Sequence, residues 1–180
     1  PPQIRVPSEL RRVRQGRTLA LFVQADEPVA QMTGKLFGRE IAFYPVESDT
    51  MHRSLIGIGV THPTKMYPLT LKAIDLIGNT REQTFEIEVV GTTFPRGSYI
   101  VLSPEKRKVM MDKSRSREDN AKRGRAYTQA TKEDAQLWEG KFIRPAEGRL
   151  TSLFGKYREY NTGVRRHHLG TDIANDVGTP

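Results

Sequence analysis

The side chains best suited to chemistry gather near the end of the sequence. His168 and Asp172 are four residues apart in "HLGTDIA", with Gly170 between them. A zinc ion accepts neutral imidazole nitrogen and carboxylate oxygen as ligands. Gly170 and the β-branched Thr171 disfavour a helix, so we expect a loop that enters a strand and lets the two side chains converge. On spacing alone a solvated surface turn is the more ordinary interpretation, because catalytic zinc usually has three protein ligands.

The sequence around this pair extends the pattern. The stretch "RPAEGRLTSLFGKYREYNTGVRRHHLGTDIANDVGTP" contains, in order, "GRLTSLFG", the basic and aromatic "KYREYNTG", "HLGTDIA" and "VGTP". It closely resembles the beginning of the lysostaphin-type, LytM-like zinc endopeptidases, which cut peptidoglycan peptides. The resemblance implies zinc as cofactor, with His168 and Asp172 as the first two metal ligands. It gives His167 no ligand role.

The same resemblance places the remaining machinery elsewhere. In that family a third ligand and the catalytic base come from a later His-x-His element, and no such element occurs in this sequence. We therefore expect no catalytic residue before Pro180, an incomplete peptidase domain over residues 141–180, and no activity from this stretch alone. Tyr157, Arg158 and Tyr160 are candidates to line a groove for the substrate peptides, against the alternative of an ordinary surface loop.

Other candidates for catalysis are weaker. Ser152 lacks the Gly-x-Ser-x-Gly turn that exposes a serine nucleophile. Glu147 and Glu159 are candidates for a pair of carboxylates in glycoside hydrolysis, but nothing in the sequence fixes their separation. His52 and His62 lie far upstream of the other histidines.

Residues from about 16 to 91 show the alternation of β-strands. The clearest pair is "YPLTLKAIDLIGNTREQTFEIEVV", in which apolar and polar residues alternate on both sides of Gly78 and Asn79. A second hairpin is predicted around "GKLFGRE". The pair resembles the last two strands of immunoglobulin-like modules of bacterial surface proteins. We interpret Asp75 as a carboxylate that caps the turn rather than as a catalytic group, and we predict an immunoglobulin-like β-sandwich over residues 1–100.

Residues 101–140 change character and predict a helical connector. Ser103 is a candidate N-cap, Pro104 suits the first helical position, and Gly124 is a candidate stop. A second helix is predicted to begin at Thr131 and to end at Gly140. So few apolar residues interrupt the charged run that we expect an exposed or partner-dependent arm.

Composition narrows the function classes. The 180 residues include no cysteine, which excludes disulfides and thiolate zinc fingers. Seventeen of the 29 lysines and arginines follow residue 100, and the net charge is +8, which favours polyanions in general. A basic nucleic-acid binder is a third hypothesis, but no motif supports a specific nucleic-acid partner. Neither a membrane span nor a signal peptide is recognisable.

Together these observations predict a mainly β protein with a helical connector: an immunoglobulin-like β-sandwich, then helices, then the start of an antiparallel β peptidase domain. The leading hypothesis is a zinc-dependent endopeptidase that hydrolyses cross-links or stem peptides of bacterial peptidoglycan. We expect it in the cell envelope, periplasmic or secreted. The alternative is a non-catalytic cell-envelope module with a binding or regulatory role, in which the peptidase domain is degenerate or missing. Candidate partners are peptidoglycan peptides and an envelope protein.

Overall fold

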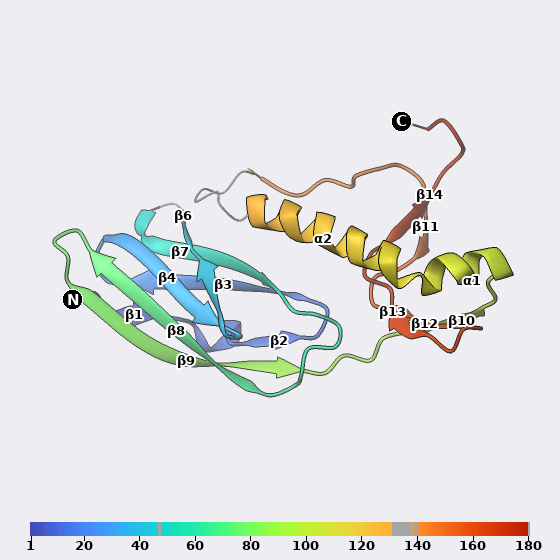
Figure 1. Cartoon of the computed structure of the whole chain (residues 1–180). Coiled ribbons are helices and arrows are strands. Elements are labelled where there is room, and N and C mark those ends of the chain that lie inside the picture. Colours follow the sequence, from blue (N-terminus) through green and yellow to red (C-terminus); the bar gives the residue numbers. More distant parts are fainter. Residues whose placement is uncertain (47, 131–137, 139, 180) are drawn as a thin grey trace. The chain divides into compact units, whose positions relative to one another are not determined.

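Over the residues that the structure describes, the protein is mainly β, with two α-helices (Figure 1). The computed structural model describes residues 1–46, 48–130, 138 and 140–179. Contacts divide the chain into two compact units, unit 1 over Pro1–Thr93 and unit 2 over Phe94–Pro180. The division falls earlier than the boundary at residue 100 that the sequence suggested, because residues 96–100 form a strand that pairs within unit 2.

Unit 1 contains two sheets. The first has the order β1-β3-β7-β6 and consists of β1 (Ile4–Arg5), β3 (Thr18–Ala25), β7 (Ser48–Gly57) and β6 (Tyr44–Val46). The second has the order β2-β9-β8-β4-β5 and consists of β2 (Arg12–Arg14), β9 (Thr80–Val90), β8 (Met66–Asp75), β4 (Val29–Leu36) and β5 (Arg39–Ala42). This is the strand order of an immunoglobulin-like sandwich, with β2 and β5 added at the two edges of the second sheet.

The core of unit 1 lies between the two sheets. Alternate residues of β8 and β9 point inward, as the sequence predicted, and Leu69, Leu71 and Ile87 are fully buried. Leu21 and Val23 of β3 meet them from the first sheet in one hydrophobic cluster. Each such side chain removed from water stabilises the fold by about 1.5–3 kcal/mol.

The hairpin predicted around "GKLFGRE" is confirmed. β4 pairs with β5 in antiparallel register, from Thr33 opposite Ala42 to Leu36 opposite Arg39. Phe37 and Gly38 form the turn, with φ angles of 55° and 75°. Positive φ at both turn residues is what a two-residue hairpin requires, so the sequence places its glycine at one of the two positions that need it.

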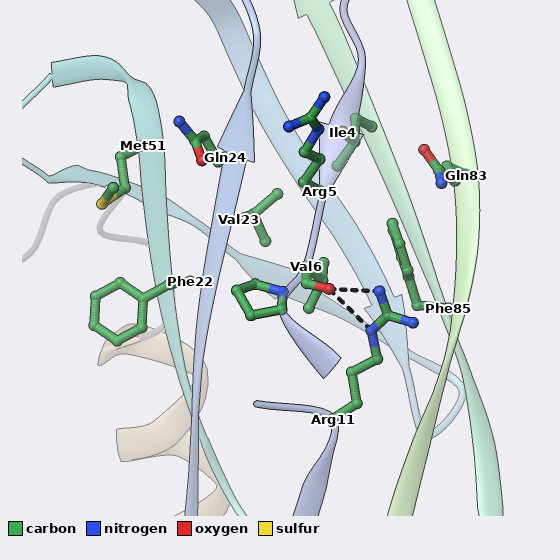
Figure 2. Close-up of a pocket in the computed structure, with 11 residues that line it drawn as sticks. Ile4, Arg5, Val6, Arg11, Phe22, Val23, Gln24, Met51, Gln83 and Phe85 are labelled. Atoms are coloured by element: carbon green, nitrogen blue, oxygen red, sulfur yellow. Dashed lines mark hydrogen bonds between the residues drawn. The ribbon is translucent and has the colours of Figure 1, made fainter. Parts of the chain in front are cut away.

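Arg11 fastens the segment that crosses from one sheet to the other (Figure 2). A 3₁₀ turn over Ser8–Leu10 separates β1 from β2. The Arg11 side chain donates to the carbonyl oxygen of Val6 through Nε at 3.0 Å and Nη2 at 2.5 Å, and its guanidinium carbon lies 4.7 Å from the Phe85 ring centre. A cavity of about 500 Å³ lies beside these contacts. β1 and β2 were not predicted, because strands of two and three residues leave no periodic pattern.

Unit 2 contains a three-stranded sheet and a two-stranded ladder. The sheet has the order β10-β12-β13, from β10 (Arg96–Ile100), β12 (Tyr157–Tyr160) and β13 (Arg165–His167). The ladder pairs β11 (Arg149–Ser152) with β14 (Asp172–Ala174). Among the described residues of this unit only Gly155 and Tyr160 are buried, so its core is small.

The connector is helical, as predicted, but its boundaries differ. Ser103 caps α1 (Pro104–Met111), and its hydroxyl accepts from the backbone N–H of Lys106. Asp112 then ends α1 and caps α2 (Lys113–Ala130) through bonds from the N–H groups of Ser114 and Arg115. The prediction that Gly124 ends the helix is wrong, because α2 continues past it and an exposed glycine costs a helix only about 1 kcal/mol. The second predicted helix, from Thr131, lies almost wholly outside the described residues.

Both helices are exposed along their whole length, apart from the half-buried Met110, over the residues whose side chains are described. This confirms the expectation of a polar arm with little apolar area to bury. Neither helix is long and apolar enough to cross a membrane.

Candidate metal centre

Two short strand ladders bring together the residues that the sequence singled out. In the β11–β14 ladder Ser152 lies opposite Asp172. In the sheet Tyr157 lies opposite His167, and just beyond this pair the N–H of His168 donates to the carbonyl of Lys156 at 2.9 Å. His168 therefore leaves β13 at the point where the chain turns toward β14, which begins at Asp172.

The side chains of His168 and Asp172 converge. His168 Nε2 lies 3.1 Å from Asp172 Oδ1. The other ring nitrogen of His168, Nδ1, lies 3.3 Å from the carbonyl oxygen of Leu153 and 3.2 Å from Ser152 Oγ. The histidine side chain is 14% exposed and the carboxylate 51% exposed, so the pair sits at the surface with its imidazole mostly covered. The expected loop that lets the two side chains meet is confirmed.

Arg158 holds the far side of the carboxylate. Its Nη2 donates to Asp172 Oδ2 at 2.8 Å and to Ser152 Oγ at 2.8 Å. The arginine side chain is only 23% exposed. Arg158 was predicted to line a substrate groove. In the structure its guanidinium bonds the carboxylate of Asp172, and substrate binding by Arg158 stays a prediction.

The arrangement fits two positions of a zinc site. Two ligands at zinc–ligand distances of 2.0–2.1 Å and a tetrahedral angle lie about 3.3 Å apart, close to the 3.1 Å between Nε2 and Oδ1. A histidine that binds a metal through one ring nitrogen usually donates the other N–H to a carboxylate, a backbone carbonyl or water, and His168 Nδ1 lies 3.3 Å from the carbonyl oxygen of Leu153. Within the described residues, no group of three histidine or carboxylate side chains is placed to hold a metal ion.

His167 lies in different surroundings from its neighbour. Its Nδ1 is 2.7 Å from the carbonyl oxygen of Gly155. Its ring packs edge-on against Phe94 and Tyr157, with ring centres 5.2 and 5.3 Å away. These contacts give His167 a packing role, and none of them indicates that it is a metal ligand.

The two tyrosines proposed for substrate binding differ in their accessibility. Tyr160 is 6% exposed, and the guanidinium carbon of Arg166 lies 5.1 Å from its ring centre. Tyr157 is half-buried, with its ring against His167. Tyr160 thus has little surface to offer a peptide, and substrate binding by either tyrosine stays a prediction.

The weaker catalytic candidates, Glu147, Glu159 and Ser152, make contacts that stabilise the local structure. Glu159 pairs with Arg165 at 2.9 Å, and this hydrogen bond and the carboxylate's charge raise the pKa of Arg165. Glu147 contributes its backbone carbonyl to a bond from Asn175. Ser152, set aside as a nucleophile, is instead a member of a cluster with Arg158, His168 and Asp172, which we call the Asp172 cluster. Sequence reasoning had no signal for that membership, because it depends on the register of the β11–β14 ladder.

Asp75 confirms its predicted turn-capping role. Its Oδ1 accepts from the N–H groups of Ile77 and Asn79, at 3.0 and 2.8 Å. The side-chain amide of Asn79 donates to Oδ2 at 2.8 Å. Every hydrogen bond that the structure shows for the Asp75 carboxylate therefore comes from its own turn.

Comparisons with known proteins give a distant structural likeness. No protein-family model matches the chain, and no curated protein matches it. Among solved structures, the BIgI domain of beta protein from S. agalactiae bound to CEACAM1 is similar, at 19% sequence identity and a TM-score of 0.31. The match covers 51% of this chain and 100% of that chain.

Proposed function

We propose that the chain carries part of the site of a zinc-dependent endopeptidase that hydrolyses peptidoglycan peptides. One observation carries the proposal: His168 Nε2 and Asp172 Oδ1 meet at ligand spacing, with the second nitrogen of His168 turned to a backbone carbonyl. The resemblance of residues 144–180 to lysostaphin-type endopeptidases supplies the substrate class. The same resemblance suggests a place in the cell envelope.

In this proposal the chain's own residues hold and orient the metal. His168 and Asp172 supply one nitrogen and one oxygen ligand, and Leu153 and Ser152 fix the ring of His168 through Nδ1. Bound zinc supplies a Lewis acid for a peptide carbonyl and lowers the pKa of coordinated water. In this proposal the third protein ligand and the general base do not come from the residues that the structure describes.

The experiment compares three forms of the protein that contains this sequence: wild type, Asp172→Ala and Asp176→Ala. Asp176 is a matched carboxylate four residues further along the chain, and it is exposed. The hydrogen bonds that the structure shows for Asp176 involve Asn175 and Thr179, which lie outside the Asp172 cluster. We expect stoichiometric zinc and release of soluble wall peptides from wild type and Asp176→Ala. Asp172→Ala should lose both. Wall hydrolysis that persists in Asp172→Ala would contradict the proposed metal site.

A second candidate function has one observation in its favour. The described residues supply only two metal ligands, and unit 1 is an immunoglobulin-like sandwich, an architecture that many cell-surface domains share. A non-catalytic envelope module that binds a partner would need neither the third ligand nor zinc. If the protein retains no zinc after dialysis and still binds purified peptidoglycan sacculi, this candidate replaces the first.

A further inference from the structure

Arg158 is the residue of the Asp172 cluster to which the proposed function gives no role. A single nitrogen, Nη2, bonds both Asp172 Oδ2 and Ser152 Oγ, each at 2.8 Å. Arg158 comes from β12, Ser152 from β11 and Asp172 from β14, so one guanidinium ties three strands together. Its low exposure and its two partners inside the cluster argue against a group waiting for substrate.

The two oxygens of Asp172 face different neighbours. Oδ1 faces His168 Nε2, and Oδ2 faces the guanidinium of Arg158. A metal ion between Nε2 and Oδ1 would leave the bond from Arg158 to Oδ2 in place. That bond keeps the second oxygen away from the metal, so the carboxylate offers one oxygen rather than two.

We propose that Arg158 is a positioning residue that restricts Asp172 to one-oxygen coordination and thereby favours a small tetrahedral ion over larger ones. The inference rests on the proposed function, because it takes His168 and Asp172 as ligands. Zinc is satisfied with four ligands in a tetrahedron. Ions that take six or more oxygen ligands, such as Mn²⁺ and Ca²⁺, gain from a carboxylate that offers both of its oxygens.

Metal affinity alone cannot test this role. Removal of a guanidinium loosens the carboxylate, which weakens binding, but it also removes a positive charge that repels any cation. The two effects oppose each other, so a change in the affinity for one metal does not separate them. Zn²⁺ and Mn²⁺ carry the same charge, so the change in repulsion largely cancels in the ratio of their affinities. The ratio reports the geometry of the carboxylate.

The experiment measures the affinity of the protein that contains this sequence for each metal alone. Zn²⁺ is titrated in competition with a chelating dye, and free Mn²⁺ is followed by electron paramagnetic resonance. Arg158→Met should lower the Zn²⁺/Mn²⁺ affinity ratio about 10-fold, the lower end of the usual range for residues that orient metal ligands. Arg158→Lys should lower it less, because an ammonium can still donate to Oδ2.

Arg165→Met is the matched control. It removes the same charge from the neighbouring strand, where Arg165 pairs with Glu159 at 2.9 Å and is exposed. Its ratio should equal that of wild type. An unchanged ratio in Arg158→Met, with zinc binding lost in Asp172→Asn, overturns the role of Arg158 and leaves the proposed function standing. Zinc binding that is the same in wild type and Asp172→Asn overturns both.

Discussion

Asp75 and Asn79 close the β8–β9 turn by holding each other at both backbone and side chain. The N–H of Asn79 donates to Asp75 Oδ1 at 2.8 Å, its amide donates to Oδ2 at 2.8 Å, and the N–H of Asp75 donates to the carbonyl of Asn79 at 3.0 Å. Burial alone would raise the pKa of this carboxyl group. The hydrogen bonds from Asn79 and Ile77 outweigh burial, so the pKa of Asp75 lies below its usual value.

Replacement of Asp75 by alanine should destabilise unit 1. The substitution leaves the amide and N–H of Asn79 and the N–H of Ile77 without their acceptor. We expect the melting temperature of unit 1 in scanning calorimetry to fall by roughly 5–10 °C. Glu86→Gln, on the exposed face of β9, should leave the melting temperature within about 2 °C of wild type.

The pH dependence has a definite sign. Because the folded-state pKa of Asp75 is lowered, its contribution to stability is complete above the ordinary value of 3.8 and is lost as the pH falls through the folded-state pKa. The free energy of unfolding of Asp75→Ala should therefore lie closer to that of wild type in strong acid than at neutral pH. A deficit that stays constant down to pH 2 would mean that the bonds to Asn79 do not depend on the charge.

His52 should make unit 1 sensitive to mild acid. The residue is 5% exposed, its Nδ1 has no hydrogen-bond partner, and burial lowers its pKa more than the nearby charge of Asp49 raises it. The unfolded chain therefore binds a proton first as the pH falls below 6.5. Stability from the neutral ring is complete above that pH and declines below it, toward the lowered folded-state pKa.

The measurement is the melting temperature of unit 1 at pH 7.5 and pH 5.5. Wild type should melt at a lower temperature at pH 5.5, and His52→Leu should show a smaller difference between the two conditions. His62→Gln removes another histidine of the same unit and serves as control. If His62→Gln abolishes the difference and His52→Leu does not, the acid sensitivity belongs to His62.

The sequence predicted the features that depend on neighbours along the chain. The alternation in β8 and β9, the turn at Gly78 and Asn79, and the cap at Asp75 involve residues that lie within a few positions of each other. The helix start at Ser103 is equally local. Such features follow from backbone preferences and from one buried face, which a single sequence displays directly.

The features that escaped prediction depend on register between distant strands. The bond from Arg158 to Asp172 exists because β11, β12 and β14 align, and nothing in the spacing of the three residues encodes that alignment. The parallel pairing of β10 with β12 joins segments on either side of the connector. The meeting of His168 with Asp172, four residues apart, was predictable, whereas the bond from Arg158 to Asp172 was not.

Gly155 should be irreplaceable because of Phe94. The glycine has φ of 82°, and a Cβ at this position would overlap the Phe94 ring. Gly163 has a similar φ of 77° with open space around it, which makes it a matched control. Gly163→Ala should cost about 1 kcal/mol for the left-handed backbone. Gly155→Ala should cost about 2–4 kcal/mol, since overpacking adds to the same backbone strain. Chemical denaturation of unit 2 measures both, and equal losses would contradict the overlap with Phe94.

The connector should be the first target of proteolysis. Side chains from Lys113 to Arg125 in α2 are exposed, and six of them are lysine or arginine. Little buried area opposes local unfolding of this helix, so trypsin gains access to its backbone easily. Brief digestion should cut between Lys113 and Arg125 before it cuts at Lys35 or Lys72 in the strands of unit 1. Equal resistance of the two regions would show that α2 packs as firmly as the sandwich.

The adjacent histidines should separate metal binding from stability. His168 faces Asp172, whereas His167 bonds the carbonyl of Gly155 and packs against Phe94 and Tyr157. With only two ligands the 180-residue chain should bind zinc weakly, and His168→Ala should abolish even that binding. His167→Ala should keep the zinc affinity of wild type but lower the melting temperature of unit 2, because it removes the ring that fills the space between Phe94 and Tyr157. Calorimetric titration with zinc and thermal melts of both variants give the answer. Stoichiometric tight zinc in wild type that disappears in His167→Ala would make His167 a ligand and overturn the packing role assigned to it.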